Sequence, residues 1–175
     1  MNIRISNLPQ YLLYLLPLAL LSGPFVPDLI ISILTLIFLY ISIKDKQFKY
    51  YNNNFFYICI IFYFYLIFNS LFSEFRLEAL KVSIFYFRFF IFALVVWYVI
   101  DNNKNFLKIF FFFLATTYSI ALIDGYYQYF FNTNLLGIES PGVRMTLLFN
   151  DKLILGGYLS RLFPLLIGLL ILNYR

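Results

Sequence analysis

Long apolar runs, separated by short polar segments, make up most of this chain. A membrane-spanning helix needs about 20 apolar residues at a rise of about 1.5 Å per residue. Six runs reach or approach this length, and they cover residues 9–25, 27–43, 55–72, 82–100, 106–123 and 153–172. The pattern therefore predicts an all-α fold: a polytopic transmembrane helix bundle of about six spans, in a single transmembrane domain over residues 1–175.

The first two runs are separated only by residues 23–27, Gly-Pro-Phe-Val-Pro. Pro24 and Pro27 lack a backbone N–H, and each disfavours helical geometry in the residue before it. We therefore predict a tight helical hairpin, with a re-entrant pair as the alternative because the first run is short. A signal peptide is another interpretation, since Arg4 precedes an apolar stretch, but no A-x-A cleavage site follows.

The composition agrees with a membrane protein and excludes several kinds of site. Charged residues make up 12% of the chain and hydrophobic residues 63%, whereas soluble domains carry roughly 25% charged residues. The chain has no histidine, which excludes histidine as a metal ligand or general base. Its one cysteine, Cys59, allows no disulfide framework. No metalloprotease, P-loop or serine-hydrolase motif is present, so we predict no metal and no cofactor and leave the catalytic residues unknown.

The distribution of lysine and arginine predicts the orientation. With the N-terminus in the cytoplasm, the inner connecting segments hold seven of these residues and the outer segments four. Cytoplasmic segments of membrane proteins carry the excess of basic residues. This orientation places the segment 124–152 on the outer face, and it makes residues 73–81 an outer connection that we expect to form a short interfacial helix.

The segment 124–152 concentrates the polar chemistry of the chain between two apolar runs. It contains three acids and two bases, which are Asp124, Glu139, Asp151, Arg144 and Lys152. Its first residues, DGYYQYFF, place Gln128 among five aromatic side chains. Aromatic residues are enriched at membrane interfaces, so an interfacial belt and part of a glycan-binding surface are both consistent with this sequence.

Two arginines lie inside apolar runs. Counted from the outer ends of their predicted helices, Arg88 is about 9 Å deep and Arg161 about 12 Å deep. A guanidinium at mid-bilayer costs about 2.5–3.5 kcal/mol on insertion scales, so such residues usually face a polar interior. With Arg144 and Lys152 they would form a cationic site suited to phosphate oxygens. The alternatives for Arg88 are a structural pair with Asp124 and a side chain that extends to the interface.

Two stretches resemble the O-antigen ligase and O-antigen polymerase superfamily of bacterial inner-membrane glycosyltransferases. One is the opening hairpin, LPLALLSGPFVPDLIISILTLIFL, and the other is DGYYQYFFNTNLLGI followed by RMTLLFNDKLILGGYLSRLFPLL. In that family a D-x-x-Q-like stretch ends one span and precedes an outer loop with an R-x-(T/S)-x-x-F-x-(D/N) run. A glycine-containing helix then follows. By position, Arg144 matches the arginine of the loop motif and Arg161 matches an arginine embedded in the membrane.

The resemblance implies an undecaprenyl-pyrophosphate-linked glycan as the donor, in lipopolysaccharide or other surface polysaccharide biosynthesis. The acceptor would be lipid A–core for a ligase or a second glycan repeat for a polymerase. The expected substrate-binding residues for the pyrophosphate and glycan are Arg144, Arg161, Arg88, Asp124 and Gln128. The expected location is the bacterial inner membrane, with no metal and no nucleic acid involved.

Members of this family have further spans and a large periplasmic loop with a functional histidine. We therefore expect residues 1–175 to be an N-terminal half that has no transferase activity by itself. The alternative is a small non-enzymatic transporter or lipid-binding membrane module. Transporters often contain inverted repeats and broken helices near the midplane, and the sequence shows no repeat and only the break at residues 23–27.

Overall fold

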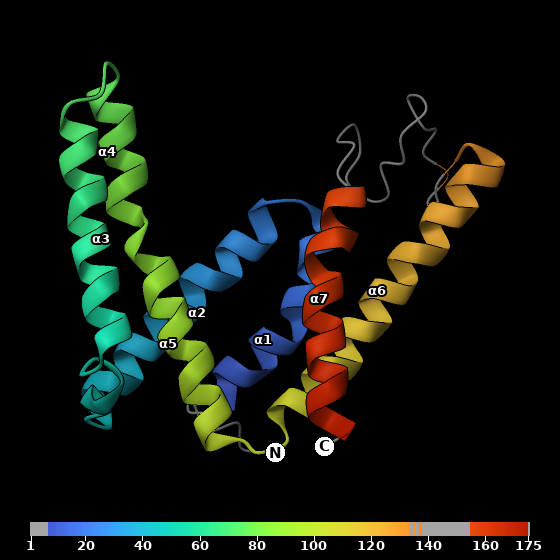
Figure 1. Ribbon diagram of the computed structural model, residues 1–175, viewed down its shortest axis with the longest axis horizontal. Coiled ribbons are helices and arrows are strands. Elements are labelled where there is room, and N and C mark those ends of the chain that lie inside the picture. Colours follow the sequence, from blue (N-terminus) through green and yellow to red (C-terminus); the bar gives the residue numbers. More distant parts are fainter. Residues whose placement is uncertain (1–6, 134, 136, 138–154, 175) are drawn as a thin grey trace. The chain divides into compact units, whose positions relative to one another are not determined.

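The structure is a computed structural model that describes residues 7–133, 135, 137 and 155–174. These residues form seven α-helices and no β-strand (Figure 1). The α-helices are α1 (Leu8–Ala19), α2 (Phe25–Lys44), α3 (Asn54–Leu71), α4 (Arg76–Phe85), α5 (Phe87–Asn102), α6 (Phe106–Phe131) and α7 (Leu155–Tyr174). Two short 3-10 helices are η2 (Leu20–Ser22) and η3 (Phe48–Tyr50).

Within the described residues, five helical segments are long and apolar enough to cross a membrane. They are Phe25–Lys44, Asn54–Leu71, Arg76–Asn102, Phe106–Phe131 and Gly156–Asn173. The helix over Leu8–Ser22 is apolar but shorter than these five. The predicted all-α transmembrane fold is therefore confirmed, and the first predicted span is the one that falls short of a full crossing.

The predicted break between the first two apolar runs is also confirmed. Helical structure ends at Ser22 and resumes at Phe25, and Gly23 between them has a φ of 99°. A side chain with a Cβ rarely adopts a positive φ, so glycine suits this turn. Asp28 then lies in the first turn of α2, where a negative charge interacts favourably with the helix dipole.

The chain divides into two compact units. Residues 30–102 form most of the first unit, and residues 10–29 with 103–175 form the second. The first unit contains most of α2 together with α3, α4 and α5. The second contains most of α1, the start of α2, α6 and α7.

In the first unit α3 and α4 form an antiparallel hairpin (Figure 1). The hydroxyls of Ser70 and Ser83 share a buried hydrogen bond between these two helices. At the other end of α3, the buried Tyr50 lies among Phe38, Trp97 and Tyr98, with ring centroids 5.7 to 6.1 Å apart. This aromatic cluster joins η3 to α2 and α5.

The segment over residues 73–81 differs from its prediction as a separate interfacial helix. Residues 76–81 of this segment are the start of α4, and α4 and α5 together form one candidate span, Arg76–Asn102, with a break at Tyr86. Leucine, glutamate, alanine and lysine all favour helix, so the RLEALK sequence continues the helix although its charges lower the local hydropathy. Arg88 is consequently twelve residues, about 18 Å, from the start of α4.

In the second unit α1 packs against α6 and accepts a hydrogen bond from α7. The Tyr14 ring stacks against the rings of Phe106 and Phe113, with centroids 5.3 and 5.5 Å away. The Tyr158 hydroxyl on α7 donates a hydrogen bond of 3.2 Å to the carbonyl oxygen of Pro17. Pro17 lies near the end of α1, where helix carbonyls lack partners within the helix. An unpaired carbonyl is costly in a bilayer, so Tyr158 stabilises this helix end.

Candidate functional site

One face of α6 is buried along most of its length. The buried residues on this face are spaced three and four apart, and we call them the α6 stripe: Leu114, Thr117, Ala121, Asp124 and Gln128. Such spacing keeps side chains on one side of a helix. The Thr117 hydroxyl donates to the carbonyl of Phe113 within the helix. The stripe therefore changes from largely apolar to polar toward the end of α6, at Asp124 and Gln128.

The apolar part of the α6 stripe packs against α7. Ala121 forms a buried cluster with Tyr158 and Leu21, flanked by Leu162 of α7. The two helices diverge toward the end of α6 (Figure 1). Asp124 and Gln128 continue the face that carries Ala121 toward this end of α6.

Asp124 accepts a hydrogen bond from the backbone of the segment that follows α6. The helix ends at Phe131. The next residue, Asn132, has a left-handed φ of 57°, and its N–H donates to the carbonyl of Gln128 over 2.9 Å. The chain then turns back, and the N–H of Leu135 donates to Oδ1 of Asp124 over 2.7 Å. Asp124 is 3% exposed, and among the described residues its Oδ2 atom has no hydrogen-bond partner. Asp124 therefore ties Leu135, which follows the end of α6, to the last turns of the helix.

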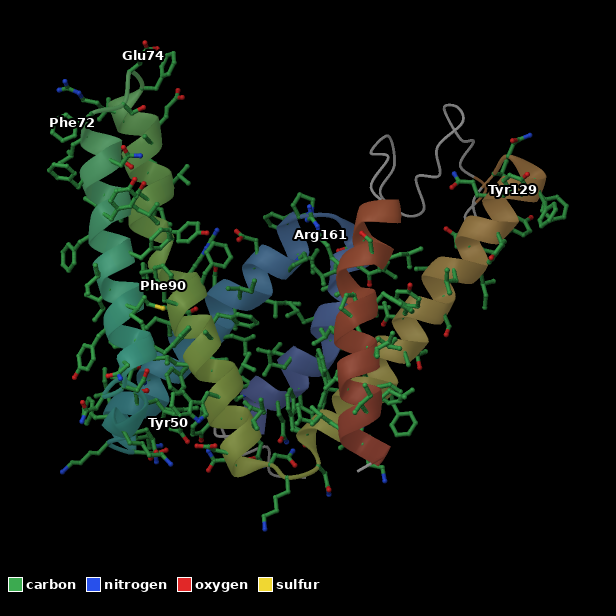
Figure 2. All side chains as sticks on the ribbon, viewed as in Figure 1. Tyr50, Phe72, Glu74, Phe90, Tyr129 and Arg161 are labelled. Atoms are coloured by element: carbon green, nitrogen blue, oxygen red, sulfur yellow. The ribbon has the colours of Figure 1, made fainter. Side chains whose placement is uncertain are left out.

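The five aromatic residues near the end of α6 divide between two faces. With a helical period of 3.6 residues, Tyr127 and Phe131 lie on the same side as Asp124 and Gln128. Their rings stack with centroids 4.6 Å apart. The three aromatic residues on the opposite side, Tyr126, Tyr129 and Phe130, are exposed, and Figure 2 shows Tyr129 at this end of the helix.

Arg161 lies about 9 Å along α7 from Leu155 and is exposed (Figure 2). Tyr158 and Leu162 on the same helix pack toward Ala121 of α6, whereas the Arg161 side chain is exposed. No hydrogen bond or ion pair joins Arg161 to another described residue. The structure thus brings Asp124 and Gln128 together, and Arg161 is not in contact with them.

Arg88 lies in the first unit, next to the break between α4 and α5. Its Nη1 atom donates to the Ser32 hydroxyl over 3.2 Å, and its backbone carbonyl accepts from the Thr35 hydroxyl over 3.2 Å. Its guanidinium also lies 5.1 Å from the centre of the Phe89 ring. Arg88 is therefore half-buried among polar groups of α2. Asp124 belongs to the other unit, so the predicted pair of Arg88 with Asp124 stays a prediction.

Side-chain hydroxyls from two neighbouring helices hydrogen-bond to the backbone around this break. The Tyr63 hydroxyl on α3 donates to the carbonyl of Ile84 over 3.0 Å, and Thr35 on α2 donates to that of Arg88. Tyr86 N–H bonds to Ser83, and Phe89 N–H bonds to Tyr86, both with a spacing of three residues. The Tyr63 hydroxyl thus satisfies a carbonyl at the end of α4 that a continuous helix would pair internally, and the Thr35 hydroxyl adds a second bond to a carbonyl in the first turn of α5.

Several predicted residues lie outside the part of the chain that the structure describes. These are Arg144, Lys152, Glu139 and Asp151. Sequence reasoning had not separated Tyr127 and Phe131 from the other aromatic residues, although their spacing of three and seven from Asp124 was a usable signal. It also missed Ser32, Thr35 and Tyr63, which lie in apolar runs and resemble ordinary helix residues.

Comparison with protein-family models, with curated proteins and with solved structures found no match to this chain. Among the described residues, no group of three histidine, cysteine, aspartate or glutamate side chains is arranged to hold a metal ion.

Proposed function

We propose that this chain is part of a bacterial inner-membrane glycosyltransferase that ligates or polymerises an undecaprenyl-pyrophosphate-linked glycan at the periplasmic face. The acceptor is lipid A–core or a second glycan repeat. Asp124 and Gln128 contact the glycan, and Arg161, Arg144 and Arg88 contact phosphate. The observation that carries the proposal is the polar end of the α6 stripe.

We infer from the length of α6 that this polar end lies near a membrane surface. The helix has 26 residues, which at 1.5 Å per residue is about 39 Å, compared with about 30 Å for the hydrocarbon core. A helix of this length extends beyond the hydrocarbon core, and we assign the headgroup region to its last turns, which carry Asp124, Gln128 and the exposed aromatic residues. A lipid-linked glycan presents its pyrophosphate and first sugars at this same depth.

Arg161 supports the same proposal through its charge. A cation about 9 Å along a membrane-spanning helix is costly unless it reaches polar or anionic groups. A guanidinium can bind a phosphate through two parallel hydrogen bonds. The pyrophosphate of the donor would supply this partner, and the resemblance of the Arg144 and Arg161 regions to the superfamily adds the reaction class.

The test is complementation in the bacterium that carries the gene, with surface polysaccharide as the readout. We expect Arg161→Ala to abolish the polysaccharide, Arg161→Lys to restore part of it, and the matched control Lys108→Ala to leave it unchanged. Immunoblotting of membrane fractions shows whether each variant inserts. Normal polysaccharide with inserted Arg161→Ala protein would refute the assigned role of Arg161, and normal polysaccharide after deletion of the gene would refute the function.

A transporter of an anionic solute is the second candidate, and the break between α4 and α5 favours it. Transporters bind substrates where helices are discontinuous within the membrane, and Arg88 lies two residues after the break. Loss of solute uptake in Arg88→Ala, with unchanged surface polysaccharide, would favour this candidate over the glycosyltransferase.

A further inference from the structure

Three candidate spans of the first unit have ends that the aromatic cluster around Tyr50 joins (Figure 2). One span ends at Lys44, the next begins at Asn54 and the third ends at Asn102. The turn that begins at the end of α2 therefore lies where the chain leaves the apolar part of the membrane. It carries three exposed lysines, which we call the turn lysines: Lys44, Lys46 and Lys49.

The backbone of this turn has a defined conformation. Lys46 has a left-handed φ of 50°, and the N–H of Gln47 donates to the carbonyl of Ser42 over 3.0 Å. This is a helix C-terminal motif in which glycine usually occupies the left-handed position. A residue with a Cβ is less favourable there than glycine, so backbone conformation does not account for the lysine. At the other end of the turn, the side chain of Asn53 accepts from the N–H of Phe56 over 2.8 Å and begins α3.

Aromatic rings lie under two of the turn lysines. The Nζ atom of Lys44 is 5.6 Å from the centre of the Tyr40 ring, and that of Lys49 is 4.7 Å from the centre of the Tyr50 ring. An ammonium group has three N–H donors, and a contact with a ring face leaves donors available for another acceptor. Tyrosine rings are enriched at the headgroup level of a bilayer. These contacts therefore suit ammonium groups that lie at the depth of the lipid phosphates.

The acidic side chains nearby do not neutralise the turn. Asp101 pairs with Lys49 over 3.9 Å, but these two side chains are 41% and 66% exposed, and an exposed pair contributes little. Asp45 is also exposed, and within the described part of the chain no ion pair of its carboxylate is present. Three lysines against two aspartates leave one net positive charge at this end of the first unit.

We propose that the turn lysines bind the headgroup of an anionic phospholipid in the leaflet at this end of α2 and α3. Their ammonium groups contact the phosphate oxygens, and the ring of Phe48, which is 58% exposed, packs at the boundary between headgroups and acyl chains. A lipid fits better than a soluble anion because the lysines follow the end of an apolar span, where the bilayer itself supplies phosphate. This inference does not depend on the proposed transferase function.

The single tryptophan of the chain can report this lipid directly. The ring of Trp97 lies 5.8 Å from that of Tyr50 and is 41% exposed. The full chain is reconstituted into vesicles that mix phosphatidylcholine with phosphatidylglycerol, and one of the two lipids carries brominated acyl chains. Bromine quenches tryptophan fluorescence on contact, so the two quenching curves give the binding constant of the anionic lipid relative to the zwitterionic one.

We expect the wild type to prefer phosphatidylglycerol about fivefold in 0.1 M salt, which corresponds to one net basic residue near an anionic surface. The preference should fall to one or below when all three turn lysines are replaced by alanine. It should also fall toward one in 1 M salt, where the Debye length decreases from about 10 Å to about 3 Å. Asp101→Asn removes a negative charge and should raise the preference.

Lys46→Gly separates the charge from the fold. Glycine suits a φ of 50°, so the thermal midpoint, followed by circular dichroism, should not fall, while the lipid preference should decrease toward one. Lys46→Arg keeps the charge and should keep the preference. The matched control is Lys81→Ala, which changes an exposed lysine of α4 beyond the opposite end of α3, and it should leave the preference within twofold of the wild type.

Three results would overturn the inference. The first is equal quenching of the wild type by the two brominated lipids. The second is a preference for phosphatidylglycerol that survives replacement of all three turn lysines. The third is a loss in Lys81→Ala as large as that in Lys46→Gly, because the preference would then follow the total charge of the protein and not this turn.

Discussion

The contact between Tyr158 and Pro17 makes a direct prediction about how α7 is held. The hydroxyl of Tyr158 donates to the Pro17 carbonyl, and the same ring packs on Leu21 and Ala121. Tyr158→Phe removes the hydroxyl and keeps the ring. The carbonyl of Pro17 then loses the donor that satisfies it at the end of α1.

The magnitude follows from the burial of this contact. Tyr158 is 8% exposed, so water does not readily replace the lost donor. Hydrogen bonds between membrane helices average about 0.6 kcal/mol and reach about 1.7 kcal/mol, and an unsatisfied buried acceptor costs about 1–3 kcal/mol. We therefore expect Tyr158→Phe to lower the free energy of unfolding by about 1–2 kcal/mol. Truncation in Tyr158→Ala also removes the ring and should cost about 3–5 kcal/mol.

The assay is reversible unfolding of the full chain in mixed micelles with increasing SDS, followed by circular dichroism. Tyr118→Phe is the matched control, because the ring of Tyr118 lies against that of Phe163 and, within the described residues, no hydrogen bond of its hydroxyl is present. The control should change stability by less than about 0.5 kcal/mol. Equal effects of Tyr158→Phe and Tyr118→Phe would show that the bond to Pro17 does not stabilise α1 against α7.

Three further predictions concern the first unit. Tyr50→Ala removes the buried centre of the aromatic cluster and should lower the free energy of unfolding by about 3–5 kcal/mol in the same SDS titration; a loss below about 1 kcal/mol would contradict the cluster's role. Ser83→Ala leaves the buried Ser70 hydroxyl without its interhelical partner, and we expect a loss of about 0.6–1.7 kcal/mol that the double variant with Ser70→Ala does not double. Burial raises the pKa of Tyr51 above its ordinary value of 10.0, although the hydrogen bond with Ser42 lowers it by a smaller amount. The folded phenol keeps its proton to higher pH than the unfolded one, so the contribution of Tyr51 to stability is fully present below pH 10 and is lost as the pH rises above it. The thermal midpoints at pH 9 and 11 should therefore differ less in Tyr51→Phe than in the wild type. An equal difference in the two proteins would refute the role of Tyr51.

The fold class was predictable because the hydrocarbon core imposes a minimum length on apolar helices. The break at Gly23 was predictable too, since proline and glycine chemistry is local. The start of α4 at Arg76 was not, because its charged residues interrupt the apolar pattern while still favouring a helix. Hydropathy reports the membrane environment, and it does not report where a helix begins outside that environment.

The candidate site was only partly predictable for a different reason. Asp124 and Gln128 stood out because acids and amides are rare at the end of an apolar run. The hydrogen bond from Leu135 to Oδ1 of Asp124 could not be foreseen, because it depends on the chain turning back after the end of α6. The hydroxyls of Ser32 and Thr35 that contact Arg88 come from a helix more than 50 residues earlier, and such tertiary pairs leave no local signal.

The most direct test of the account is photo-crosslinking in cells at the end of α6. A photoreactive phenylalanine analogue replaces Tyr127 in one strain and Tyr126 in a second, and the adducts formed on irradiation are identified by mass spectrometry. The account predicts a polyprenyl-linked saccharide attached at position 127 and only phospholipid attached at position 126. Phospholipid adducts alone at both positions would contradict the claim that the end of α6 with Asp124 and Gln128 contacts a lipid-linked glycan.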